Sequence, residues 1–130
     1  MADSFYVPMG DGKWLATVHT TGPWDAAAQH GGPPSALLGR VMQRCEPRDD
    51  MIIARFTCEI LSAIPVGELS VQARLARPGR SVQLLEGVIT AGGREVALAR
   101  VWRVLRAQSP SAGPRSPNWP RTFRHSIADR

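Results

Sequence analysis

A single segment of the chain carries apolar residues at helical spacing. Between residues 33 and 46 they fall at positions that form one stripe of a helix: Leu37, Leu38, Val41, Met42 and Cys45. The opposite side of this helix is polar and holds Arg40, Gln43 and Arg44. A proline costs little in the first helical turn, so Pro33 and Pro34 favour a helix start, and Pro47 favours a helix end. The pattern predicts one amphipathic helix over residues 33–46.

The segments that follow the predicted helix alternate between apolar and polar residues, which is the period of a half-buried strand. The alternation is clear in residues 54–61 and 69–75. It is less regular in residues 81–90 and 95–105, which predicts more deeply buried strands. One or two further strands are expected before the helix, with residues 13–20 as the clearest candidate. We therefore expect one or two strands, one helix and then four antiparallel strands.

Glycine and proline mark the turns between these strands. Ala91-Gly92-Gly93 predicts a hairpin turn between the last two strands. Pro78-Gly79 suits a type II turn, whose twist does not match a tight hairpin. A longer loop or a bulge is therefore expected around residues 77–80.

This order of elements predicts the fold class. A sheet with one apolar face must cover that face, and only one helix is available to do so. The sequence therefore predicts an α+β protein of the hotdog architecture, in which an antiparallel sheet of five or six strands wraps around one central helix. We expect residues 1–108 to form a single hotdog domain, and residues 109–130 to be a flexible tail rich in proline and arginine.

Composition and charge exclude several classes of protein. The chain has 130 residues, of which 43% are hydrophobic and 21% charged, as in ordinary globular domains. The net charge is +5, but the residues after Arg106 hold four arginines and one aspartate, which leaves only +2 on the first 106 residues. A nucleic-acid-binding protein usually concentrates basic residues on its folded part, so we expect no nucleic-acid partner.

Membrane and secretory features are not expected either. No apolar run approaches the ~20 residues of a membrane helix, and the N-terminus lacks the pattern of a secretory signal. The two cysteines, Cys45 and Cys58, form no CxxC pair and fit buried free thiols. These observations favour a cytoplasmic protein without a membrane partner.

The segment from residue 22 to residue 34 is the best candidate for chemistry. It leads into the N-terminus of the helix, where unpaired N–H groups favour an anion or a developing oxyanion. Gly31 and Gly32 allow close approach of a ligand to the backbone and permit positive φ. A thioester carbonyl docked here would be polarised as water attacks. The nearby side chains able to orient or activate that water are Asp25, Gln29 and His30.

The same segments resemble a known family. GPWDAAAQHGGPPSALLGR, ARFTCEIL and IPVGELSVQARLARPGRSVQLLEGVITAGGREVALARVWRVLR are similar, in order and spacing, to the N-terminal hotdog of the type II acyl-CoA thioesterase-like family. The resemblance covers roughly residues 12–106, and its most specific elements are His30-Gly31-Gly32 and the segment from Arg77 to Ser81. It implies hydrolysis or binding of a fatty or related acyl-CoA thioester. Coenzyme A would enter as part of the substrate, and no other cofactor is implied.

The resemblance also leaves an alternative function open. Members of this family usually carry two hotdogs in tandem, and their best-known catalytic Asp, Ser/Thr and Gln lie in the second, whereas this chain resembles the first. The alternative is a non-catalytic hotdog that binds acyl groups or serves as a structural half and needs a second hotdog. A hydratase is a third, weaker alternative on the same fold. A lone hotdog leaves sheet edges exposed, so we expect a homodimer or a second hotdog chain as partner.

Each candidate residue also has a structural alternative. Asp25 could close an Asx turn, His30 could serve as a hydrogen-bonding residue before the helix, and the glycines could only shape the corner. Arg77 and Arg80 could pair with the phosphates of coenzyme A or lie in a solvated loop. No metal site is expected, because the three histidines and two cysteines match no ligand spacing.

Overall fold

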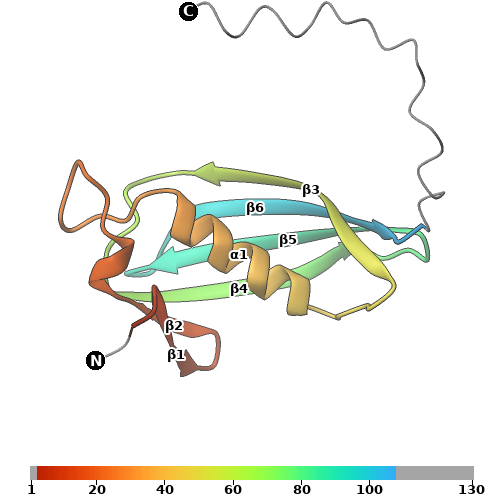
Figure 1. Ribbon diagram of the computed structural model, residues 1–130, viewed down its shortest axis with the longest axis horizontal. Helices are drawn as coiled ribbons and strands as arrows, with labels where there is room; N and C mark the ends of the chain where they lie inside the picture. Colours follow the sequence, from red (N-terminus) through yellow and green to blue (C-terminus); the bar gives the residue numbers. More distant parts are fainter. Residues whose placement is uncertain (1–2, 108–130) are drawn as a thin grey trace, which may run out of the picture.

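One helix crosses one face of a six-stranded antiparallel sheet (Figure 1). The computed structural model describes residues 3–107, so the tail expected at residues 109–130 lies outside the described residues. The elements in chain order are β1 (Tyr6–Gly10), β2 (Lys13–Ala16), the 3-10 turn η1 (Val18–Thr20), α1 (Gly32–Arg44), β3 (Met51–Ile60), β4 (Glu68–Arg77), β5 (Val82–Ala91) and β6 (Arg94–Leu105). This architecture confirms the predicted α+β hotdog fold with a single helix.

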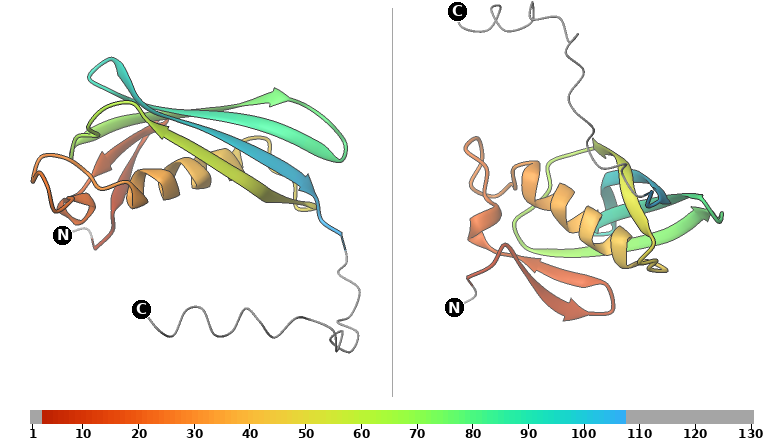
Figure 2. Two further views of the ribbon diagram at one scale, coloured as in Figure 1. Left: turned by 90° about the horizontal axis from the view of Figure 1, so that it is seen from above. Right: turned by 45° about the vertical axis from the view of Figure 1, so that its right-hand side comes forward.

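The strand order determines what lies on each side of the helix. The order is β1-β2-β4-β5-β6-β3, so the meander β4-β5-β6 forms the centre of the sheet. The β1–β2 hairpin pairs with β4 at one edge, and β3 pairs with β6 at the other. The sheet curls over α1 (Figure 2). As a result, α1 has the hairpin along one flank and β3 along the other.

The predicted apolar stripe of the helix forms the centre of the core. Leu37, Leu38 and Met42 are buried, and Val41 and Cys45 pack against them in part. On the sheet, alternate positions of the central strands face the helix, including Leu69, Leu85, Ile89 and Val101.

Gly87 on β5 allows α1 to lie close to the sheet. A Cβ at this position would lie 2.8 Å from the sulfur of Met42 and 3.1 Å from a methyl carbon of Leu38. The glycine therefore sets how closely the helix packs.

Several element boundaries differ from the sequence prediction. The helix ends at Arg44 rather than at residue 46, because Cys45 already has an extended backbone and Glu46, with a φ of +43°, turns the chain. The strand expected at residues 13–20 stops at Ala16 and continues as η1. The first strand, β1, pairs with β2 through a register irregularity between Pro8 and Gly10.

The predicted turns are confirmed. Gly92 and Gly93 form a two-residue hairpin between β5 and β6 with φ values of +56° and +77°. The register of β4 and β5 shifts between Leu75 and Arg77, which is the irregularity expected near residues 77–80. No helix in residues 3–107 is long and apolar enough to cross a membrane.

Candidate functional site

The segment before α1 is fixed to two neighbouring parts of the chain. Gln29 donates its backbone N–H to the carbonyl of Ile64 at 2.8 Å, and His30 donates to the carbonyl of Thr20 at 3.0 Å. Residues 22–28 form a short loop. A hydrogen bond of 2.9 Å from the N–H of Gly22 to the carbonyl of Ala28 closes this loop. These bonds fix the position at which the helix begins.

The N-terminus of α1 offers two exposed backbone donors. Gly31 is the N-cap, no side chain caps the helix, and the N–H groups of Gly31 and Gly32 donate no hydrogen bond within residues 3–107. Pro33 and Pro34 have no N–H, so the first turn provides fewer donors than a helix N-terminus usually does. An oxyanion at this end of the helix would therefore bind Gly31 and Gly32 alone.

The reason for glycine at these positions differs from the one expected. Gly31 has a φ of −69°, and the glycines with positive φ in residues 3–107 lie elsewhere, so positive φ was a wrong expectation here. Space is the observed reason. A Cβ on Gly31 would lie 3.3 Å from the Cδ1 atom of Ile60, and a Cβ on Gly32 would lie 3.2 Å from the Cε1 atom of His30.

A groove of about 560 Å³ runs beside the helix N-terminus, between α1 and the β1–β2 hairpin. The hairpin side consists of Phe5, Tyr6, Pro8 and Trp14. The helix side consists of His30, Gly32, Pro33, Ala36, Leu37 and Arg40. Most of these side chains are apolar, so the groove suits a hydrocarbon chain. We call it the hairpin groove.

Of the three predicted catalytic side chains, His30 is the one that lines the hairpin groove. Asp25 is exposed, and its Oδ1 accepts a 2.8 Å hydrogen bond from the N–H of Ala27 in an Asx turn. The structure thus brings His30, Gly31 and Gly32 together and places Asp25 in the loop of residues 22–28 before them. Their catalytic roles remain predictions.

The side chain of Gln29 is hydrogen-bonded at both ends of its amide. Its Oε1 accepts a 2.5 Å bond from the hydroxyl of Tyr6, and its Nε2 donates a 2.7 Å bond to the carbonyl of Pro65. Burial raises the pKa of the Tyr6 phenol well above its ordinary value, which keeps this hydroxyl protonated as a donor. Gln29 therefore ties β1, the helix-leading segment and the segment before β4 together.

Arg77 and Arg80 lie at the other end of the fold, near the C-terminus of α1. Both are exposed; Arg77 is the last residue of β4, and Arg80 lies in the β4–β5 connection. Arg48, which follows α1, donates to the carbonyls of Gly79 and Arg80. The 13-residue helix spans about 20 Å, so the two arginines do not join Gly31 and Gly32 within one chain. Their role in binding phosphate remains a prediction.

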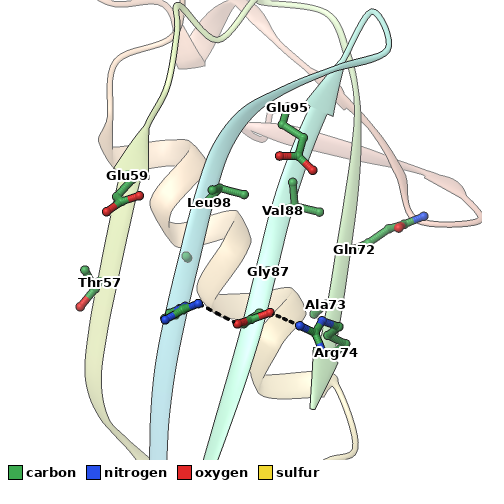
Figure 3. A pocket seen from close by; sticks show the side chains of 12 residues that line it. Thr57, Glu59, Gln72, Ala73, Arg74, Gly87, Val88, Glu95 and Leu98 are labelled. Atoms are coloured by element: carbon green, nitrogen blue, oxygen red, sulfur yellow. Dashed lines mark hydrogen bonds and ion pairs between the residues drawn. The ribbon is translucent and has the colours of Figure 1, made fainter. Parts of the chain in front are cut away.

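A second hollow lies on the outer face of the sheet, away from the helix (Figure 3). It has a volume of about 610 Å³, and Glu86 in its lining pairs with Arg74 and with Arg100, the latter at 3.1 Å. Thr57, Glu59 and Gln72 border it. Its two arginines are both paired with Glu86 and no helix N-terminus faces it, so it offers less for thioester chemistry than the hairpin groove.

The part of the chain that the structure describes contains no group of three His, Cys, Asp or Glu side chains that could hold a metal ion. Cys45 and Cys58 are free and half-buried, and burial raises the pKa of the Cys45 thiol. A raised pKa lowers the thiolate fraction, which makes Cys45 a poor nucleophile.

A comparison with known protein families matched residues 20–104 to the family described as acyl-CoA thioesterase N-terminal domain. The match covers more than half of the 130 residues. The chain belongs to the acyl-CoA thioesterase N-terminal domain family. The resemblance found in the sequence is thereby confirmed. A comparison with curated proteins gave no significant match.

Solved structures similar to this acyl-CoA thioesterase N-terminal domain include proteins crystallised with coenzyme A compounds. A Bacillus halodurans protein crystallised with CoA aligns with a TM-score of 0.64 and 16% identity, over 72% of this chain and 69% of that chain. A Streptococcus mutans protein bound to acetyl-CoA aligns with a TM-score of 0.63 and 16% identity, over 78% of this chain and 86% of that chain. A thioesterase from Haemophilus influenzae aligns with a TM-score of 0.62 and 15% identity, over 78% and 76% respectively. At these identities the alignments show the hotdog fold alone.

Sequence reasoning missed the groove side chains that come from outside the segment 22–34. Tyr6 and Trp14 lie on the hairpin, and Ala36 and Arg40 lie on the side of the helix that its pattern marks as polar. A signal for Ala36 was present, because Gly32, Ala36 and Arg40 are spaced by four residues and form one helical stripe.

Proposed function

We propose that this chain is an acyl-CoA thioesterase that hydrolyses acyl-CoA at the N-terminus of α1. The observation that carries the proposal is the position of two free backbone donors, at Gly31 and Gly32, at one end of an apolar groove. The membership in a thioesterase family supports the reaction class. The CoA and acetyl-CoA bound by structurally similar proteins support the substrate class.

In the proposed mechanism the thioester carbonyl lies against the N–H groups of Gly31 and Gly32. Water attacks the carbonyl carbon, and the charge that develops on the oxygen is stabilised by these donors and by the helix dipole. His30 accepts a proton from the attacking water. The tetrahedral intermediate then collapses, the carbon–sulfur bond breaks, and the thiolate of coenzyme A takes that proton as it leaves. The products are a free acid and coenzyme A.

Gln29 serves as a positioning residue in this proposal. Its amide is already bound to Tyr6 and to the carbonyl of Pro65, so it acts by fixing the backbone of His30 and Gly31 rather than by binding water. Asp25 has no part in the chemistry of this proposal, because its Oδ1 is bound to the N–H of Ala27 in the turn.

The alternative is an acyl-binding hotdog that needs a second hotdog for turnover. One observation favours a partner. β3 is an edge strand, and the exposed Ile60 at its end contacts the position of Gly31. A second chain along β3 would therefore border the proposed oxyanion site. We propose that this partner is a second copy of the chain.

Release of free coenzyme A from octanoyl-CoA and palmitoyl-CoA tests the proposal. We expect turnover by the wild-type protein, and a loss of about a hundredfold or more in kcat for His30→Ala. Asp25→Ala should retain turnover within a few fold. Tight binding of acyl-CoA by the wild type without release of coenzyme A would support the non-catalytic alternative, and full activity of His30→Ala would exclude His30 as the base.

A further inference from the structure

The hairpin groove ends at a cationic side chain that has no acidic partner. Arg40 lines the groove and is exposed, and the ion pairs of residues 3–107 do not include it. The residues one turn away on α1 are also not acidic; they are Ala36, Leu37, Gln43 and Arg44. The positive charge of Arg40 is therefore available to an anion in the groove.

The groove between the helix N-terminus and Arg40 is apolar and has room along its helix side. Gly32, Ala36 and Arg40 follow one another at four-residue spacing, and the two that precede the arginine are small. At a rise of 1.5 Å per residue, Gly32 and Arg40 are about 12 Å apart along the helix. This length corresponds to an extended acyl chain of medium length.

We propose that the hairpin groove selects acyl-CoA thioesters whose acyl chain ends in a carboxylate, and that Arg40 binds this carboxylate. The proposal rests on the proposed function, which places the thioester carbonyl at Gly31 and Gly32. The methylene chain lies against Ala36 and Trp14, and the terminal carboxylate meets the guanidinium at the far end. Guanidinium and carboxylate match in geometry and form strong charge-assisted hydrogen bonds.

The chemistry of the groove favours the acyl chain over the pantetheine arm of coenzyme A. The pantetheine arm carries two amides, and an amide buried without hydrogen-bond partners costs free energy. The hairpin side of the groove offers few partners, since the hydroxyl of Tyr6 already donates to Gln29. A hydrocarbon chain needs no such partners, so it is the better occupant.

Octanoyl-CoA and suberyl-CoA form a matched pair of probes, because they differ only in a terminal methyl group or carboxylate. The full-length wild-type protein should have a higher kcat/KM for suberyl-CoA than for octanoyl-CoA. Arg40→Gln should lower the kcat/KM for suberyl-CoA about tenfold more than that for octanoyl-CoA, which corresponds to ~1.4 kcal/mol. Arg40→Glu should lower the ratio further through repulsion of like charges.

Arg94→Gln is the matched control, because it removes the same charge from an exposed arginine at the start of β6 outside the groove. It should leave the ratio of the two kcat/KM values unchanged. Equal losses for both thioesters in Arg40→Gln would assign Arg40 to the coenzyme A part and overturn the proposal. Unchanged kcat/KM values for both thioesters in Arg40→Gln would overturn it as well.

A second pair of variants tests the groove itself. Ala36→Phe fills the helix side of the groove and should lower kcat/KM for both thioesters, whereas Gln43→Phe, at an exposed helix position outside the groove, should not. Equal behaviour of these two variants would place the acyl chain elsewhere.

Binding measurements separate this inference from the proposed function. If neither thioester is hydrolysed, the dissociation constants of octanoyl-CoA and suberyl-CoA are measured by calorimetry for wild type and Arg40→Gln. If suberyl-CoA binds more tightly than octanoyl-CoA and this difference is lost in Arg40→Gln, the inference holds even though the proposed hydrolysis does not. Equal binding of both thioesters by the wild type would overturn the inference.

Discussion

The guanidinium of Arg103 on β6 donates two hydrogen bonds, at 3.1 Å and 2.6 Å, to the side-chain oxygen of Gln83, its buried partner on the neighbouring strand β5. Arg103 is only 2% exposed, and its remaining bonds go to the carbonyls of Cys45 and Glu46 at the end of α1. Cys45 is the C-cap of α1, so this guanidinium lies at the helix end that carries partial negative charge. A buried cation is thus stabilised by an amide and a helix end, and it fastens the helix to the sheet.

Arg103→Met should be strongly destabilising. The variant leaves the side-chain oxygen of Gln83 and two carbonyls without donors, at a cost of roughly 3 kcal/mol or more in the free energy of unfolding. Urea denaturation measures this loss. Arg100→Met on the same strand is the control, because Arg100 is exposed and its pair with Glu86 should contribute about 1 kcal/mol or less. Equal effects of the two variants would contradict the role given to Arg103.

Two glycine-to-alanine substitutions should have opposite effects on stability. Gly87→Ala places a Cβ 2.8 Å from the sulfur of Met42, and such overpacking costs about 1–3 kcal/mol. Gly39→Ala adds a methyl group in the middle of α1 with Phe56 at an ordinary 3.9 Å, and should gain roughly 0.5–1 kcal/mol from helix propensity. Thermal unfolding followed by circular dichroism checks both signs. A stabilising Gly87→Ala would show that the helix packs less closely on β5 than described.

Gly32→Val should abolish hydrolysis of acyl-CoA while the fold is retained. The branched side chain would press against the imidazole of His30, from which even a Cβ is 3.2 Å away, and would cover the free N–H groups. Gly67→Val is the control, since a Cβ there meets nothing within 4 Å. Turnover near the wild-type level in Gly32→Val would mean that the glycine serves only the corner before the helix.

The chain should form a homodimer across β3. The other edge strand, β1, contains Pro8, which disfavours pairing, whereas β3 has neither proline nor glycine over ten residues. Phe56 and Ile60 on β3 are also exposed. Light scattering at micromolar concentration should give about twice 14.2 kDa.

Matched substitutions locate this dimer interface. Phe56→Asp should yield monomers, and Phe5→Asp, which places the same charge at an exposed phenylalanine next to β1, should not. A wild-type monomer that is well folded at this concentration would instead favour a different hotdog chain as the partner.

The pair of Arg48 and Asp50 should make stability depend on pH in the acidic range. Arg48 donates two hydrogen bonds to the carboxylate, at 2.9 Å and 2.6 Å, and holds the pKa of Asp50 below its usual value. The stabilisation is therefore fully present above the unfolded pKa of about 3.9, and is lost as the pH falls through the lower folded pKa. The difference in melting temperature between wild type and Asp50→Asn should shrink over that range. A constant difference would mean that the pair contributes through packing.

Local patterns in the sequence were sufficient to predict most of the fold. The helical stripe of Leu37, Leu38 and Met42 is the buried face, and Gly92-Gly93 forms the hairpin, because periodicity and turn geometry depend only on neighbouring residues. β1 was not located, since Pro8 and Gly10 interrupt the alternation of Tyr6–Gly10.

The site was less predictable, because its walls depend on long-range pairing. The hydroxyl of Tyr6 meets Gln29, 23 residues later in the chain, and no local pattern predicts that contact. Arg40 has the spacing of a solvent-facing residue, and only the position of the β1–β2 hairpin beside α1 makes it part of a groove.

The hairpin that forms one wall of the groove is joined to the sheet by a short ladder. β2 pairs with β4 over three residue pairs, from Lys13 to Leu15, whereas β5 and β6 share ten. Segments with few backbone hydrogen bonds open with less free energy than the global unfolding of the domain. Once the hydrogen bond between Tyr6 and Gln29 breaks, we therefore expect this wall to separate from α1 at a lower free energy than the unfolding of the meander. For an acyl chain bound in the groove as proposed, the rate of release is then set by how often the hairpin opens rather than by the depth of the groove.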